Sequence, residues 1–197
     1  MTPAGVILAA GESSRMGTDK ALLPYDDTTF VEHLLGFFLA RVSPVVVVLG
    51  YNAARIAAAV APRPGLQVVV NQDYALGQLS SLQTGLRALP ADAPAVLVTL
   101  VDHPAVREST LDAILARASA PLAVPRHQGR RGHPVLFSRR LIEELLALPP
   151  TASAKQVVHA HRDETILVEV DDPGILRDID TPEDYRELEP ASRAHRD

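Results

Sequence analysis

Residues 6 to 20, VILAAGESSRMGTDK, join an apolar run to a loop of small and polar residues. The apolar run is typical of a buried strand, and the loop contains Gly11 and Gly17. Glycines allow several backbone N–H groups to surround one anion. Arg15 and Lys20 add cations that suit a forked contact and a point contact with phosphate oxygens. The stretch therefore predicts a strand that leads into a nucleoside triphosphate site, although it contains neither GxxxxGK(S/T) nor GxGxxG.

The rest of the chain alternates strand-like runs with segments of helical length. Apolar runs typical of strands lie at residues 6–10, 45–49, 66–70, 95–100, 122–125 and 166–170. Between them, residues 29–41 and residues 79–89 are long enough for helices. Strands that are apolar throughout indicate a parallel sheet covered by helices on both faces. We expect one α/β domain over residues 1–188, with a mainly parallel sheet, and a polar C-terminal tail over residues 189–197.

The composition is that of a globular protein with a substantial core. The chain has 197 residues and a net charge of -5, and 47% of its residues are apolar. This balance argues against disorder and gives no reason to expect a nucleic acid partner. The absence of cysteine excludes disulfides and thiolate chemistry. Because no run has the length or pattern of a membrane span or an export signal, we expect no membrane partner and a cytoplasmic location.

A second polar stretch, NQDYALGQLSSL at residues 71–82, follows the third predicted strand. Gly77 allows the backbone to approach a planar base closely. We expect Ser80 and Ser81 to cap the following helix and to donate hydrogen bonds to a ligand.

The run at residues 95–100 is followed by Val101, Asp102, His103 and Pro104. This order places a carboxylate where a parallel sheet meets its ligands, and the proline stops the strand. Mg²⁺ prefers one or two carboxylates together with phosphate and water oxygens, so Asp102 is a candidate metal ligand. The alternative is that Asp102 caps the next helix, a role that Glu108 or Ser109 can also fill.

Two later stretches carry further charged residues. Residues 125–137 contain two glycines, two histidines and three arginines before a short apolar run, and they form either a clamp for an anionic second substrate or a solvated hairpin. In DIDTPEDY, residues 178–185, Thr181 as N-cap and Pro182 as first helical residue explain the start of a helix. They leave Asp178 and Asp180 unexplained.

These stretches together resemble one enzyme family. Residues 8 to 20 fill every position of LAxGxSxRMGxxK, the signature of nucleotidyltransferases that activate sugars, terpenoid precursors and the molybdenum cofactor. The resemblance continues in Gly77, in the Asp-x-Pro at Asp102 and in DIDTPED, and it spans residues 6 to 185. It implies a single-domain, Rossmann-like, three-layer α/β fold of the nucleotide-diphospho-sugar transferase type.

The resemblance also implies roles for particular residues. It assigns catalysis to Arg15, Lys20 and Asp102, and binding of Mg²⁺ to Asp102 and Asp180, with Asp178 as the weaker candidate for the second ligand. The run GRRGHPVLF at residues 129–137 is similar to one that the molybdenum-cofactor branch uses near its acceptor, and it implies acceptor contacts for Arg131, Gly132 and His133. The implied nucleotide contacts are Leu8, Ala9, Ala10, Gly11, Arg15, Lys20, Asn71, Gly77 and Ser81.

Within the family, the chain is most similar to the molybdenum-cofactor nucleotidyltransferases, and among these to the cytidylyltransferases, which carry LAAG at the first loop. The methyl group of Ala10 narrows the pocket over the base and favours a pyrimidine, a difference worth about 1 to 3 kcal/mol. We therefore expect Mg²⁺-dependent transfer of CMP from CTP to the terminal phosphate of molybdopterin. We also expect transient contact with a molybdoenzyme.

Other interpretations are left open by the sequence. The nucleotide can be GTP, or the acceptor another phosphorylated metabolite, such as a sugar phosphate or phospholactate. A non-catalytic nucleotide-binding module or a cofactor chaperone is disfavoured because Asp102 and Asp180 are both kept beside two cations. A dinucleotide-dependent oxidoreductase is disfavoured by the glycine spacing and by Gly50-Tyr51-Asn52, which offers no acidic ribose partner after the second strand.

Overall fold

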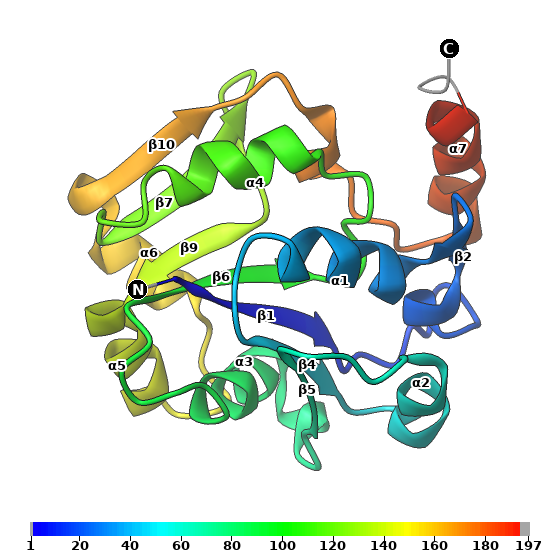
Figure 1. The fold of residues 1–197 in the computed structure, drawn as a ribbon, viewed down its shortest axis with the longest axis horizontal. Helices are drawn as coiled ribbons and strands as arrows, with labels where there is room; N and C mark the ends of the chain where they lie inside the picture. The colour runs from blue at the N-terminus through cyan, green and yellow to red at the C-terminus, as the bar shows by residue number, and fades with distance from the viewer. Residues whose placement is uncertain (1, 194–197) are drawn as a thin grey trace.

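A central sheet with helices on both sides forms the protein, as a computed structural model of residues 2–193 shows (Figure 1). The strands are β1 (Ala4–Ala9), β2 (Pro24–Tyr25), β3 (Thr28–Thr29), β4 (Val45–Leu49), β5 (Leu66–Val70), β6 (Ala95–Leu100), β7 (Leu122–His127), β8 (Arg130–Arg131), β9 (Val135–Ser138) and β10 (Thr165–Glu169). The α-helices are α1 (Phe30–Leu39), α2 (Ala53–Ala59), α3 (Gln78–Arg87), α4 (Glu108–Leu115), α5 (Arg139–Ala147), α6 (Lys155–Ala160) and α7 (Pro182–Arg193). Short 3₁₀ helices are η1 (Lys20–Leu22), η2 (Tyr74–Leu76), η3 (Arg162–Glu164) and η4 (Pro173–Leu176).

The main sheet is mostly parallel. Its strand order is β10-β7-β9-β6-β1-β4-β5, and β8 pairs with β7. β1 lies between β4 and β6 and is parallel to both, and the β4–β5 and β7–β10 pairs are parallel as well. β9 is antiparallel to both of its neighbours, β6 and β7. The expected mainly parallel sheet is confirmed, whereas the direction of β9 was not predicted from the sequence.

Both faces of the sheet are buried, which explains why its central strands are apolar throughout. In β1, Val6 and Leu8 pack in one core with residues of α3, α5 and α6. Ile7 and Ala9 point to the opposite face and pack in a second core with residues of α1, α2 and α4. All four side chains are buried. The sheet and its two helix layers form the three-layer α/β arrangement that the sequence predicted.

The predicted elements agree closely with the observed ones. All six predicted strands overlap observed strands, and the runs at 45–49, 66–70 and 95–100 match β4, β5 and β6 at both ends. The segment 29–41 contains α1, and α3 begins one residue before the predicted 79–89 segment and ends two residues earlier. Among the helices that the structure describes, none is long and apolar enough to cross a membrane.

The C-terminal segment is described only in part. Helix α7 extends to Arg193 and includes the first residues of the 189–197 segment that the sequence assigns to a tail. Residues 194–197 lie outside the described residues. The division of the chain at residue 188 therefore stays a prediction.

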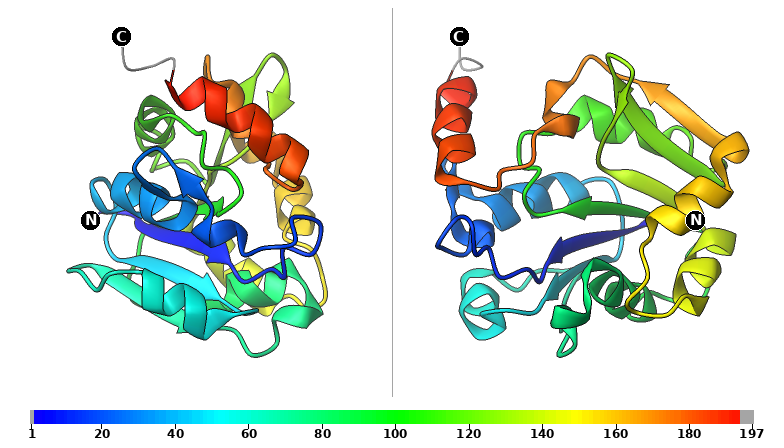
Figure 2. Two further views of the ribbon diagram at one scale, coloured as in Figure 1. Left: turned by 90° about the vertical axis from the view of Figure 1, so that its right-hand side faces the viewer. Right: turned by 180° about the vertical axis from the view of Figure 1, so that it is seen from behind.

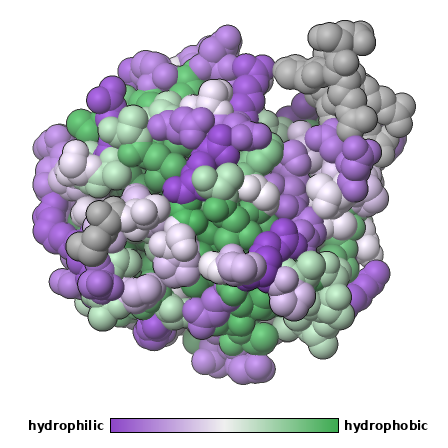
Figure 3. Space-filling model, in the orientation of Figure 1, coloured by the Kyte–Doolittle hydropathy of each residue, from purple (hydrophilic) through white to green (hydrophobic). Residues whose placement is uncertain are grey.

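The carboxyl ends of β1 and β6 face the end of the molecule at which α7 lies, opposite the N-terminus (Figures 1 and 2). The segment before α7 is attached there, because the amide of Ile179 donates a hydrogen bond of 2.9 Å to the carbonyl oxygen of Asp102. The face in Figure 3 mixes hydrophilic and hydrophobic residues, as is ordinary for a protein surface. Parallel sheets bind their ligands beyond the carboxyl ends of their strands, so a ligand site is expected at this end.

Candidate active site

The loop after β1 has unpaired backbone donors. Among the hydrogen bonds of residues 2–193, none is donated by the amides of residues 11–15. The loop closes in a turn, in which the carbonyl of Ser13 accepts hydrogen bonds of 3.0 Å from the amides of Met16 and Gly17. Ser13 and Gly17 have φ values of 53° and 73°, the left-handed conformation that occurs in concave groups of N–H donors. The loop can therefore receive an anion without breaking hydrogen bonds of its own.

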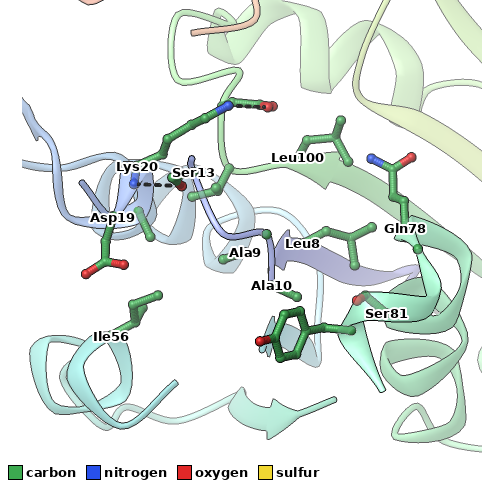
Figure 4. A pocket seen from close by; sticks show the side chains of 16 residues that line it. Leu8, Ala9, Ala10, Ser13, Asp19, Lys20, Ile56, Gln78, Ser81 and Leu100 are labelled. Carbon is green, nitrogen blue, oxygen red and sulfur yellow. Dashed lines mark hydrogen bonds and ion pairs between the residues drawn. The ribbon is translucent and has the colours of Figure 1, made fainter. Parts of the chain in front are cut away.

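A cavity of about 230 Å³ lies beside this loop. Figure 4 shows Gln78 and Ser81 of α3 on one side of it, Asp19 and Lys20 across from them, and β1 between. Arg15 and Asn71 are not among its lining residues. The predicted nucleotide contacts that line it are Leu8, Ala9, Ala10, Gly11, Lys20, Gly77 and Ser81.

Four charged residues from three segments that are distant in sequence meet at the edge of the cavity. Nζ of Lys20 lies 3.3 Å from Oδ2 of Asp102 and is also paired with Oδ1 of Asp180. Nη2 of Arg15 lies 2.6 Å from Oδ2 of Asp180. The Lys20 side chain is 12% exposed, whereas that of Arg15 is 69% exposed. Asp178 is exposed and forms no ion pair with the described residues, so Asp180 is the acid that accompanies Asp102.

Asp102 is held in its ionised form. Burial would raise the pKa of its carboxyl group, but the hydrogen bond and charge of His103, together with Lys20, outweigh burial and lower that pKa below its ordinary value. Nδ1 of His103 lies 2.9 Å from Oδ1 of Asp102. The sequence did not predict this contact, which occupies one oxygen of the carboxylate.

The start of α7 fixes the backbone of Asp180. Oδ2 of Asp184 accepts hydrogen bonds from the amides of Asp180 (3.0 Å) and Thr181 (2.7 Å), and the amide of Asp184 donates to Oγ1 of Thr181 (3.2 Å). These reciprocal bonds form a helix cap, so the predicted capping role of Thr181 is confirmed. The hydrogen bonds from Thr181, followed by the one from Asp180, lower the pKa of the Asp184 carboxyl group.

The serines of α3 belong to a buried network. Nδ2 of Asn71 donates to Oγ of Ser80 (2.9 Å) and to Oγ of Ser81 (3.0 Å). The N-cap of α3 is Gly77, whose φ of 124° is easily adopted only by glycine. The expectation that the serines cap the helix is therefore wrong, because α3 begins at Gln78 and both serines lie in its first turn. Asn71 is buried and holds Ser81 at the cavity, and a direct contact between Asn71 and a nucleotide stays a prediction.

A second cavity, of about 250 Å³, adjoins the first. Leu8, Gln78 and Leu100 line both cavities. The three predicted acceptor residues line the second cavity together with Lys155 at the start of α6, and most of the other lining side chains are apolar. Cations beside apolar walls suit a ligand with an apolar part and an anionic group.

His133 and Gly132 have clear structural surroundings in this second cavity. The ring of His133 packs edge-on against that of His103, with 4.8 Å between the ring centroids. Burial, followed by the charge of His103, lowers the pKa of His133 to about 4, so its ring is neutral near pH 7. A Cβ atom at Gly132 would lie 2.0 Å from the carbonyl oxygen of Ile175, so packing alone requires glycine there.

Several lining residues were missed by the sequence reasoning. Asp19, Ile56, Tyr74 and Gln78 line the first cavity, and Lys155 lines the second. Tyr74 and Gln78 flank Gly77 closely in the sequence, which was the available signal. Lys155 belongs to no motif, and only the packing of α6 brings it to the cavity.

Asp102 and Asp180 fit a divalent cation that is also bound by phosphates. Within residues 2–193, no group of three or more His, Cys, Asp or Glu side chains could hold a metal ion. Two carboxylates completed by substrate oxygens and water are, however, a common set of ligands for Mg²⁺. The ammonium of Lys20 between these carboxylates indicates that the position accepts a cation.

Comparisons with known proteins agree with this geometry. Residues 5–165 match the family described as MobA-like NTP transferase domain. A molybdenum cofactor cytidylyltransferase of Escherichia coli is 28% identical over 91% of this chain and 92% of its own length. A probable molybdenum cofactor guanylyltransferase of Mycobacterium marinum is 35% identical over 92% of this chain and 90% of its own length. A Mycobacterium tuberculosis protein crystallised in complex with manganese is 32% identical, with a TM-score of 0.79, and the match covers 97% of this chain and 100% of that one. The names of the curated relatives are not uniform, since one is a nicotine blue oxidoreductase.

Proposed function

The chain belongs to the MobA-like NTP transferase family, and we propose that it transfers CMP from CTP to the terminal phosphate of molybdopterin with release of pyrophosphate. The observation that carries this proposal is the meeting of Arg15, Lys20, Asp102 and Asp180 beside a loop with free amides. Donors, cations and metal-binding carboxylates around one cavity are what nucleotidyl transfer requires. The names of the cytidylyl and guanylyl relatives support molybdopterin as the acceptor.

The mechanism relies on positioning and on neutralisation of charge. An oxygen of the acceptor phosphate attacks the α-phosphorus of the nucleotide in line, and the bond to pyrophosphate breaks. The attacking oxygen is already ionised, so the reaction needs no general base. The loop amides, Arg15 and Lys20 bind the phosphates and stabilise the charge that develops on the leaving group. A divalent cation on Asp102 and Asp180 would supply further charge neutralisation, and we propose Mg²⁺ for this role.

The second cavity supports an acceptor of the proposed kind. Its apolar walls suit a flat ring system, and Arg131 and Lys155 supply positive charge for an anionic group. His133, being neutral, can orient the acceptor by a hydrogen bond without adding charge. Because the two cavities adjoin at Gln78 and Leu100, an acceptor seated in the second can reach a nucleotide in the first.

The choice of CTP is the finer part of the proposal. Ala10 lines the first cavity, and its methyl group reduces the space over a base. The relatives named above include both cytidylyl and guanylyl enzymes, so GTP is the principal alternative. Calorimetric titration with CTP and with GTP, each with Mg²⁺, distinguishes them. Tighter binding of GTP would move the assignment to guanylyl transfer.

The role of Asp102 is tested by the Asp102→Asn substitution. The amide keeps the shape of the side chain but removes the negative charge that binds the metal, so we expect turnover to fall by about 100-fold or more. The measurement is Mg²⁺-dependent release of pyrophosphate from CTP in the presence of molybdopterin. Asp92→Asn, at an exposed position before β6, is the matched control and should retain full activity. Equal rates for Asp102→Asn and the unmodified protein would remove Asp102 from the proposed metal site.

The same assay addresses the remaining alternatives. Turnover with another phosphorylated metabolite, but not with molybdopterin, would replace the acceptor and leave nucleotidyl transfer in place. Nucleotide binding without pyrophosphate release with any acceptor would favour a non-catalytic module. Transient contact with a molybdoenzyme and a cytoplasmic location are further parts of the proposal, based on the family resemblance.

A further inference from the structure

We propose that Lys20 occupies the divalent cation position when no nucleotide is bound, so that the metal enters only with the nucleotide. On entry of the metal–nucleotide complex, the ammonium of Lys20 leaves the two carboxylates and binds phosphate. This inference rests on the proposed nucleotidyl transfer and concerns the order in which the same site is filled.

The first step of the argument is the position of Lys20. Its Nζ atom lies 3.3 Å from Asp102 and is paired with Asp180, and the side chain is only 12% exposed. The carboxylates belong to segments distant in sequence, and both segments are held independently of Lys20. The Ile179 amide bonds to the carbonyl of Asp102, and Asp184 fixes the backbone at Asp180. The gap between the carboxylates is therefore built into the fold, and the ammonium fills it.

The second step is the balance of charge. Asp102 and Asp180 carry two negative charges, and Lys20 and Arg15 carry two positive charges against them. A divalent cation added to this group would meet the cations of Lys20 and Arg15. It would also find every carboxylate oxygen engaged, since Oδ1 of Asp102 contacts Nδ1 of His103. Since no larger group of ligating side chains exists within residues 2–193, free metal should bind weakly. A nucleotide changes the balance because its phosphates supply ligands for the metal and negative charge for the displaced ammonium.

The third step is the freedom of Lys20 to move. Its backbone is anchored, because its amide donates a hydrogen bond of 3.2 Å to Oγ of Ser13, but the lysine side chain has several rotatable bonds. The side chain lines the first cavity, beside the free amides of residues 11–15. The ammonium can thus pass from the carboxylates to phosphates in the loop by side-chain rotation alone.

Binding of Mn²⁺ alone tests the proposal without turnover. The probe is Mn²⁺, and its free concentration is followed by electron paramagnetic resonance in the absence of nucleotide. We expect the unmodified protein to bind Mn²⁺ weakly and Lys20→Met to bind it about tenfold more tightly, because a competing cation is removed. Arg15→Met should show a smaller gain, since Arg15 contacts only Asp180 and is largely exposed. Lys20→Arg keeps the charge and should bind Mn²⁺ as weakly as the unmodified protein.

Arg139→Met is the matched control. It also removes one cation, but Arg139 pairs with Glu143 at 3.0 Å on α5 and lines neither cavity, so Mn²⁺ affinity should not change. Circular dichroism melts verify that each variant is folded. If Lys20→Met does not fold, Arg15→Met still decides the test. Mn²⁺ affinity that is unchanged or lower in Lys20→Met and Arg15→Met overturns the proposal. If the variants show the expected order of Mn²⁺ affinities but the unmodified protein releases no pyrophosphate, the result contradicts the proposed function and not this inference.

Discussion

His133 illustrates how surroundings set the charge of a single residue. Its pKa in the folded protein is about 4, against about 6.5 in an unfolded chain, mainly because of burial. Between these pH values the unfolded state binds a proton that the folded state does not. The free energy of unfolding should therefore fall as the pH decreases from about 6.5 to about 4, by at most about 3 kcal/mol. His133→Gln should lose this part of the pH dependence, as measured by urea unfolding at pH 7 and pH 4.5.

His161 provides a control of opposite sign. Hydrogen bonds with Glu164 and then Glu144 raise the pKa of His161 above its ordinary value. Its contribution to stability is present at low pH and is lost as the pH rises through the raised pKa. The free energy of unfolding of His161→Gln should differ from that of the unmodified protein most at pH 5 to 6 and least above neutral pH. If the effect of His133→Gln on the free energy of unfolding followed this pattern instead, the pKa of His133 in the folded protein would be raised and not lowered.

The charged residues of the site were predictable because each lies in a recognisable sequence motif. Lys20, Asp102 and Asp180 were selected from separate motifs, and the structure brings them together. Neither the ion pairs between them nor the contact of His103 with Asp102 could be derived, because side-chain partners depend on the packed structure. Lys155 shows the same limit, since its place in the second cavity follows from the position of α6.

Among the elements, η1 and α2 are joined by one buried carboxylate. Asp19 is 5% exposed, and its Oδ1 accepts a hydrogen bond of 2.8 Å from Asn52 Nδ2, while Arg55 pairs with its Oδ2. Asp19→Ala leaves the Asn52 amide without this partner and loosens the backbone that positions Lys20. We expect a loss of about 1 to 3 kcal/mol in the free energy of unfolding, with weaker binding of CTP and Mg²⁺.

Chemical denaturation and calorimetric titration measure these two effects of Asp19→Ala. Asp92→Ala, at an exposed position, is the control and should change neither quantity. A destabilised variant with undiminished nucleotide affinity would show that this link supports the fold without positioning Lys20.

The elements themselves differed in how well the sequence predicted them. The central parallel strands were predicted because burial on both faces makes each a nearly continuous apolar run, as in Val45–Leu49. The short apolar run at residues 135–137 lies in the observed strand β9. The place of β9 between β6 and β7, antiparallel to both, was not predicted, because strand pairing is decided by contacts distant in sequence.

At the scale of the whole molecule, α7 attaches the end of the chain to its beginning. Leu188 is 1% exposed, and the Tyr185 hydroxyl donates a hydrogen bond of 2.8 Å to the carbonyl oxygen of Pro24. A chain of residues 1–188 keeps both contacts, so we expect its Tm within about 3 °C of the full chain, a difference of about 1 kcal/mol or less. A chain of residues 1–181 loses both contacts and the cap at Asp180, and should be destabilised by about 3 kcal/mol or more. Calorimetric melts compare the three chains, and a large fall in Tm for residues 1–188 would mean that the domain extends beyond Leu188.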